Sequence, residues 1–186
     1  FTGSVHEPIK GTKNPQKMLQ TGIPFTKKPV ALQFDYKVKM SDRENRIRAT
    51  GFSKITDVPG KDYPAAILLL QKRWEDANGN VYAKRIGTMV TYYYHSTDWK
   101  NNVTYEIMYG DITNRPEYKA HMMRLQATES YTVNSKGESV PIHEVAWGDE
   151  NDVPTHMYIQ FTSSHGGAYI GSPGNTLWVD NVKLVY

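Results

Sequence analysis

A regular alternation of apolar and polar side chains over residues 30–40 constrains the fold of this chain more than any other feature. Polar residues at 33, 35, 37 and 39 lie between the apolar ones. The apolar positions are Val30, Leu32, Phe34, Tyr36, Val38 and Met40. Successive side chains of a β-strand point to opposite faces, so a period of two predicts a long strand with one face buried.

Further segments have strand character, and turn residues rather than helical patterns separate them. They cover residues 65–74, 81–86, 89–94, 103–109, 156–161 and 177–186. Asn78-Gly79 supplies the positive φ that a tight hairpin needs between the first two. Only residues 117–127 contain a stretch of helix formers. This organisation predicts an all-β fold, an antiparallel β-sandwich of two sheets.

Length and composition exclude several classes of protein. A chain of 186 residues is the size of one ordinary domain, so we expect a single domain over 1–186. Its 39% hydrophobic and 22% charged residues exclude a disordered chain or a coiled coil. The longest apolar run, Ala65–Leu70, is far shorter than the roughly 20 residues that cross a bilayer, so no transmembrane segment is expected.

Charge and cysteine content narrow the partners further. The formal net charge is +3, and the basic residues form no dense stripe, so we expect no binding of nucleic acid. The chain has no Cys, which removes disulfides and cysteine zinc sites. His143-Glu144 begins like a zinc-protease motif, but Trp147 stands where the second His would be required.

Three aspartates are candidate metal ligands, and calcium is the one cofactor that the sequence leaves open. Asp149 and Asp152 belong to a loop of oxygen-bearing side chains, the ligands that calcium prefers. Asp180 shares strand parity with Trp178, so a buried Asp180 would need a hydrogen bond, an ion pair or a metal. A solvated loop and a carboxylate bonded to backbone N–H groups are the simpler interpretations.

No catalytic residue can be assigned from the sequence. A glycoside hydrolase needs two carboxyl groups facing each other across a cleft, and sequence cannot show such a pair. The available carboxyl groups include Glu106, Asp111, Glu129 and Glu144. The chain contains no nucleophile elbow, phosphate loop or dinucleotide fingerprint. A non-catalytic role is therefore favoured over an enzyme.

The aromatic content, 13 Tyr, 5 Phe and 4 Trp, is the strongest positive indication of function. The C–H faces of sugar rings stack on aromatic planes, while their hydroxyls take polar partners. Trp99 and Trp178 are interpreted as packing residues, and Tyr93 as the outward-facing member of Tyr92-Tyr93-Tyr94. The candidate ligand-binding residues are Trp74, Tyr82, Tyr93, Tyr118 and Trp147.

The closing segment, residues 161–186, resembles a known family. It contains Gly166-Gly167, Gly171-Ser172-Pro173-Gly174 and Trp178-Val179-Asp180. Further matches are Phe1-Thr2-Gly3, residues 22–26, Lys28-Pro29, residues 86–88 and Trp99. The chain is similar to the family named "Putative carbohydrate metabolism domain", a jelly-roll module of surface or secreted proteins of glycan-degrading gut bacteria. The resemblance implies a jelly roll, a glycan partner, and an exported protein that is extracellular or attached to the outer membrane at the cell surface.

Two features differ from the family pattern. Residues 110–152 form a longer segment than expected, and the family's domain begins before Phe1. We therefore expect that early strands of the jelly roll are missing or come from a second fragment, which would leave an unpaired edge at Phe34 or Val179.

The function expected from the sequence is a non-catalytic module that binds or positions an oligosaccharide or polysaccharide. A structural or adhesion β-sandwich without sugar binding and a glycoside hydrolase are the alternatives.

Overall fold

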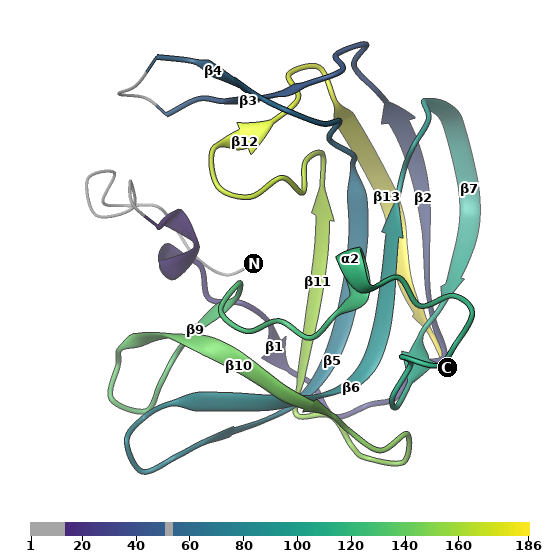
Figure 1. The fold of residues 1–186 in the computed structure, drawn as a ribbon. Coiled ribbons are helices and arrows are strands. Elements are labelled where there is room, and N and C mark those ends of the chain that lie inside the picture. Colours follow the sequence, from purple (N-terminus) through teal and green to yellow (C-terminus); the bar gives the residue numbers. More distant parts are fainter. Residues whose placement is uncertain (1–13, 51–53) are drawn as a thin grey trace. The chain divides into compact units, whose positions relative to one another are not determined.

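The computed structural model describes residues 14–50 and 54–186, and Figure 1 shows that its regular secondary structure is almost entirely β-strand. The exceptions among the described elements are a 3-10 turn, η1 (Pro15–Met18), and one short helix, α2 (Ala120–Met123). The all-β class predicted from the sequence is confirmed. Phe1-Thr2-Gly3 lies outside the described residues. No helix in the described part of the chain is long and apolar enough to cross a membrane.

The chain divides into two compact units. Among the described residues, the first contains 14–29, 68–90 and 107–159, and the second contains 30–50, 54–67, 91–106 and 160–186. The strands β5 (Ala65–Glu75), β6 (Val81–Tyr92) and β11 (His156–Thr162) contribute residues to both units. The single domain expected from chain length stays a prediction.

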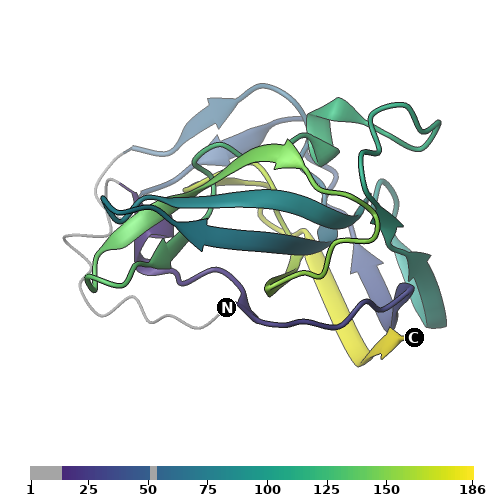
Figure 2. The same cartoon turned by 90° about the horizontal axis from the view of Figure 1, so that it is seen from below.

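The first unit contains most of a seven-stranded sheet, with the order β1-β11-β5-β6-β10-β9 and with β8 also paired to β6. Its other strands are β1 (Ile23–Pro24), β8 (Met108–Tyr109), β9 (Tyr131–Val133) and β10 (Ser139–Trp147). Figure 2 shows β5 and β6 side by side, with β10 next to β6. Val81 and Ala83 of β6 and Ile142 of β10 form a small buried cluster.

The predicted hairpin between β5 and β6 is confirmed. Gly79 has a φ of 90°, and its N–H donates to the carbonyl of Asp76 at 3.0 Å. The segments 81–86 and 89–94, predicted as two strands, are largely one strand, β6. Gly87 lies inside this strand, at a position where an added Cβ would be only 3.0 Å from both Leu70 and Ile107.

One strand pair departs from the antiparallel arrangement predicted. β10 runs parallel to β6, with His143 opposite Tyr82 and a register shift between Glu144 and Ala146. A parallel pair needs a crossover of a dozen or more residues, and the chain from Tyr92 to Ser139 is long enough to provide it.

The second unit contains two three-stranded sheets. One has the order β13-β2-β7, formed by β13 (Thr176–Val185), β2 (Ala31–Lys39) and β7 (Thr97–Glu106). The other has the order β12-β3-β4, formed by β12 (Ile170–Gly171), β3 (Arg46–Arg48) and β4 (Thr56–Val58). Figure 1 shows β2 between β13 and β7.

The alternation of apolar and polar side chains over residues 30–40 is the pattern of β2. Leu32, Phe34 and Val38 are buried on one face. The ring of Phe34 packs against Tyr105 and Phe161, with centroid distances of 5.2 Å and 5.0 Å. Burial of such side chains on one face is the main source of stability for a half-buried strand.

The structure has no unpaired edge at Phe34, because β2 is paired on both sides. Val179 lies on β13, which has β2 as its one partner among the described strands. The expectation about strands preceding Phe1 stays a prediction.

Candidate functional site

Three rings form a row across adjacent strands of the first unit. Trp74 on β5 stacks on Tyr82 of β6, with ring centroids 5.8 Å apart and planes inclined by 25°. His143 on β10 lies directly opposite Tyr82, and its ring centroid is also 5.8 Å from that of Tyr82. The Trp74 side chain is 43% exposed, and the other two rings are partly exposed. We call Trp74, Tyr82 and His143 the aromatic row.

Contacts between two hairpin ends hold the strands under the aromatic row. Glu75, next to Trp74, accepts hydrogen bonds from the N–H and the hydroxyl of Ser135 at 2.9 Å and 2.6 Å. The amide of Asn134 donates to the carbonyl of Gly79 at 3.0 Å. The hydrogen bonds from Ser135 lower the pKa of Glu75, so the contact is a charged one at neutral pH. These bonds preorganise the row.

Charged side chains lie on the same face of the sheet as the aromatic row. Lys72 is two residues before Trp74 and Lys84 two after Tyr82, and residues two apart in a strand share a face. The ammonium of Lys72 is 2.7 Å from a carboxylate oxygen of Asp152. This hydrogen bond lowers the pKa of Asp152, which is therefore a carboxylate at neutral pH. Hydrogen-bond donors and acceptors thus stand beside exposed rings.

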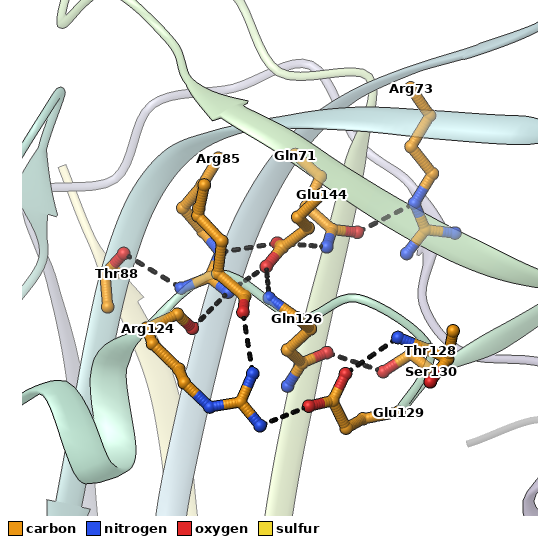
Figure 3. A network of polar contacts seen from close by, with 11 residues as sticks. Gln71, Arg73, Arg85, Thr88, Arg124, Gln126, Thr128, Glu129, Ser130 and Glu144 are labelled. Atoms are coloured by element: carbon orange, nitrogen blue, oxygen red, sulfur yellow. Dashed lines mark hydrogen bonds and ion pairs between the residues drawn. The ribbon is translucent and has the colours of Figure 1, made fainter.

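The opposite face of the same strands carries a buried polar network, drawn in Figure 3. Glu144 of β10 accepts hydrogen bonds from Nε2 of Gln71 and Nε of Arg85, both at 2.5 Å. It also accepts from Nη2 of Arg85 and from the N–H of Gln126, the latter at 2.7 Å. The side chains of Arg85 and Glu144 are 1% and 0% exposed. The network therefore links β5, β6 and β10 through side chains on the face opposite the aromatic row.

The carboxyl groups considered for hydrolysis are engaged differently from a catalytic acid. A glycosidase acid has a raised pKa. Glu144 is bound by Arg85, and the pKa of Asp111 is lowered by hydrogen bonds from Thr113. Glu106 is exposed on β7. Wherever a carboxyl pKa is clearly shifted among the described residues, the shift is downward.

The candidate residues predicted from the sequence fall into separate places. Trp74 and Tyr82 come together in the aromatic row. Tyr118 and Trp147 meet edge to face at 6.4 Å, and the guanidinium of Arg85 lies 5.6 Å from the Trp147 ring. Because Trp147 pairs in register with the buried Arg85, this second pair lies on the network side of the sheet.

The predicted outward orientation of Tyr93 is wrong, since this side chain is only 6% exposed. β6 ends at Tyr92, so its alternation does not continue, and the N–H of Tyr93 donates to the carbonyl of Pro64. The ring of Tyr93 packs at 4.7 Å from that of Tyr36, and burial raises its pKa. The neighbour Tyr94 is the exposed residue instead.

Two of the three metal candidates share a turn, in which the N–H of Asp149 donates to Oδ2 of Asp152 at 3.2 Å. In the ranges 14–50 and 54–186, no cluster of three or more His, Cys, Asp or Glu side chains could hold a metal ion. Asp152 is bound to Lys72, and Asp149 accepts the N–H of Asn151. Asp180 is exposed on β13 and accepts the N–H of Asn181. Calcium stays the open alternative to the solvated loop that the sequence favours.

Sequence reasoning did not find His143 as a site residue. Its place in the site depends on its register opposite Tyr82, which exists because β10 runs parallel to β6.

The fold and this surface define an all-β protein that presents aromatic rings beside fixed charges. The chain belongs to the family described as "Putative carbohydrate metabolism domain", whose family model matches residues 1–185. It is thus a carbohydrate-related domain. A search of curated proteins found no match.

Proposed function

We propose that this protein is a non-catalytic module that binds an oligosaccharide or polysaccharide through the aromatic row. The stack of Trp74 on Tyr82 carries the proposal, because it keeps a large indole exposed and fixed in orientation. Sugar C–H faces pack on such rings. The family's association with carbohydrate supports the same assignment.

The surroundings of the row suit a sugar. Hydroxyl groups need donors and acceptors at the edge of the stacked ring, and Lys72, Lys84 and Asp152 supply both. Neighbouring strands lie about 4.8 Å apart, so a row over three strands extends about 10 Å. That length accommodates two linked pyranose rings.

Binding is favoured over the two alternatives by the same geometry. Asp111 and Asp152, whose carboxyl pKa values are lowered by hydrogen bonds, do not provide the general acid that hydrolysis needs. Burying the Trp74 indole would stabilise a purely structural module more than exposing it. Here the indole is exposed, and hydrogen bonds between the β5–β6 and β9–β10 hairpins hold its strand in place. We further propose that the protein is exported and acts at the cell surface, which protease treatment of intact cells that express it would test.

The test is a glycan array followed by titration calorimetry on the best ligand. Replacing Trp74→Ala or Tyr82→Ala removes the stacking surface and is expected to weaken binding at least tenfold, or about 1.4 kcal/mol. Trp74→Phe keeps a flat ring and should retain part of the affinity. Val133→Ala, at an exposed apolar residue on β9, is the matched control and should bind like the parent protein.

Two results would overturn the proposal. A blank array with correctly folded protein would leave the structural or adhesion module as the better explanation. Binding that Trp74→Ala and Tyr82→Ala both leave intact would show that the aromatic row is not the site. Circular dichroism of each variant confirms that loss of binding does not reflect loss of the fold.

A further inference from the structure

The exposed face of the β13-β2-β7 sheet in the second unit presents aromatic and charged side chains that do not contribute to the buried core. Leu32, Phe34 and Val38 occupy the buried face of β2. Asp35 and Lys37 therefore belong to the other face, where side chains are expected to be merely solvated. Instead, this face presents indole rings and a fixed carboxylate.

An exposed indole stands on each side of Lys37. Trp178 of β13 is paired with Lys37, and the Lys37 ammonium lies 5.8 Å from the centre of its ring. On the other side, Tyr36 pairs with Lys100 and Val38 with Thr97, so the β7 segment opposite Lys37 contains Trp99. Trp178 and Trp99 are 40% and 47% exposed. The sequence-based assignment of both to packing positions is therefore wrong.

Asp35 is the fixed carboxylate, and both neighbouring strands deform around it. One of its oxygens accepts the N–H of Asn102 on β7 at 2.5 Å, and the other accepts the side-chain amide of Asn181 on β13 at 2.7 Å. Each Asn lies at a register shift and has a left-handed backbone, with φ of 53° and 52°. Apart from glycine, Asn is among the residues that adopt this conformation most readily, so both positions suit a bulge.

The deformation leaves polar groups next to the indoles. Asp35 is only 9% exposed, and the hydrogen bond from Asn102 lowers its pKa, so it is a buried carboxylate at neutral pH. The side chain of Asn102 remains on the surface, as does Asp180, which pairs with Asp35 in register. β-bulges commonly serve to redirect side chains at functional sites.

We propose that this face, consisting of Trp178, Lys37, Trp99, Asp35, Asn102 and Asn181, is a second carbohydrate-binding surface for an unbranched oligosaccharide of two or more pyranose rings. β13 and β7 flank β2, so the two indoles stand about 10 Å apart, the width of two strand spacings. That distance suits alternate rings of a linear glycan. The exposed side chains of Asn102 and Asp180, which the Asp35 contacts help to position, are partners for its hydroxyls.

A protein partner fits this face less well. The centre of a protein interface is depleted of charged residues, because covering them strips their water without replacement. Here a lysine lies between the two indoles, and Asp180 lies beside one of them. A glycan leaves such groups hydrated or hydrogen-bonded while it covers the rings.

The test uses the full chain and three defined probes, cellohexaose, maltohexaose and mannohexaose, followed by tryptophan fluorescence and titration calorimetry. The double variant Trp99→Ala/Trp178→Ala is compared with Trp74→Ala and with the combination of all three changes. Val182→Ala, an exposed apolar residue on β13, is the matched control. We expect Trp99→Ala/Trp178→Ala and Trp74→Ala each to remove binding at one of the two surfaces and so to lower the stoichiometry. The combination of all three changes should abolish binding.

The outcomes separate this inference from the proposed function. If Trp74→Ala alone abolishes binding and Trp99→Ala/Trp178→Ala changes nothing, the second surface does not bind sugar. If the reverse is found, the second surface stands and the aromatic row is refuted. Absence of binding to all three probes, or a change of oligomeric state on sedimentation of Trp99→Ala/Trp178→Ala, would overturn the inference, the latter in favour of a contact between two copies of the chain.

Discussion

Glu144→Gln is the substitution that most directly tests how the strands under the aromatic row are held. The change keeps the shape of the side chain but removes its charge and turns one acceptor oxygen into a donor. In the native protein Glu144 accepts hydrogen bonds from Gln71, Arg85 and Gln126. The variant would place an amide N–H against these donors and leave the buried guanidinium of Arg85 without a counter-charge.

The expected loss of stability follows from the burial of this pair. Removing one partner of a buried ion pair typically costs about 3–5 kcal/mol, because the remaining charge is uncompensated. Both side chains are essentially inaccessible, so solvent cannot screen the effect. For a protein of this size each kcal/mol lowers Tm by about 2–4 °C, so a decrease of roughly 10 °C is expected.

Urea denaturation followed by circular dichroism measures this loss. Asp152→Asn is the matched control, because it removes the more exposed pair with Lys72 and should cost far less stability than Glu144→Gln. Arg85→Met/Glu144→Leu removes both charges and should recover part of the stability lost in Glu144→Gln. The reasoning fails if Glu144→Gln costs no more than Asp152→Asn.

Two further predictions concern pH and metal. Burial, followed by the charge of Arg73, lowers the pKa of His156 to about 4. The unfolded chain, with the ordinary value of 6.5, then binds a proton that the folded protein does not, so stability decreases as pH falls from 6.5 to about 4. His156→Gln should flatten this dependence in urea titrations, and an unchanged slope would assign it to other groups. Calcium is expected to leave Tm unchanged against EDTA, because the carboxylate of Asp152 is already bound to Lys72; a rise in Tm that Asp149→Asn abolishes would instead establish a site.

The alternation over residues 30–40 and the Asn78-Gly79 turn were sufficient to predict β2 and the β5–β6 hairpin. Both depend on local chemistry, namely which face of a strand is apolar and which residue adopts a positive φ. The all-β class follows from the same signals repeated along the chain. Trp74 and Tyr82 could be chosen for the same reason, since they flank that hairpin.

The remaining features depend on partners that are distant in sequence. Arg85 and Glu144 are 59 positions apart, and their pairing exists only because β10 runs parallel to β6. The exposure of Trp178 and the burial of Tyr93 likewise reflect where strands end and which sheet covers them. The period of a strand defines two faces, but it does not say which face meets another part of the chain. The sequence therefore determined strands with clear periodicity such as β2, β5 and β6, whereas β10 was not evident from its sequence and tertiary packing decided which aromatic rings remain available to a ligand.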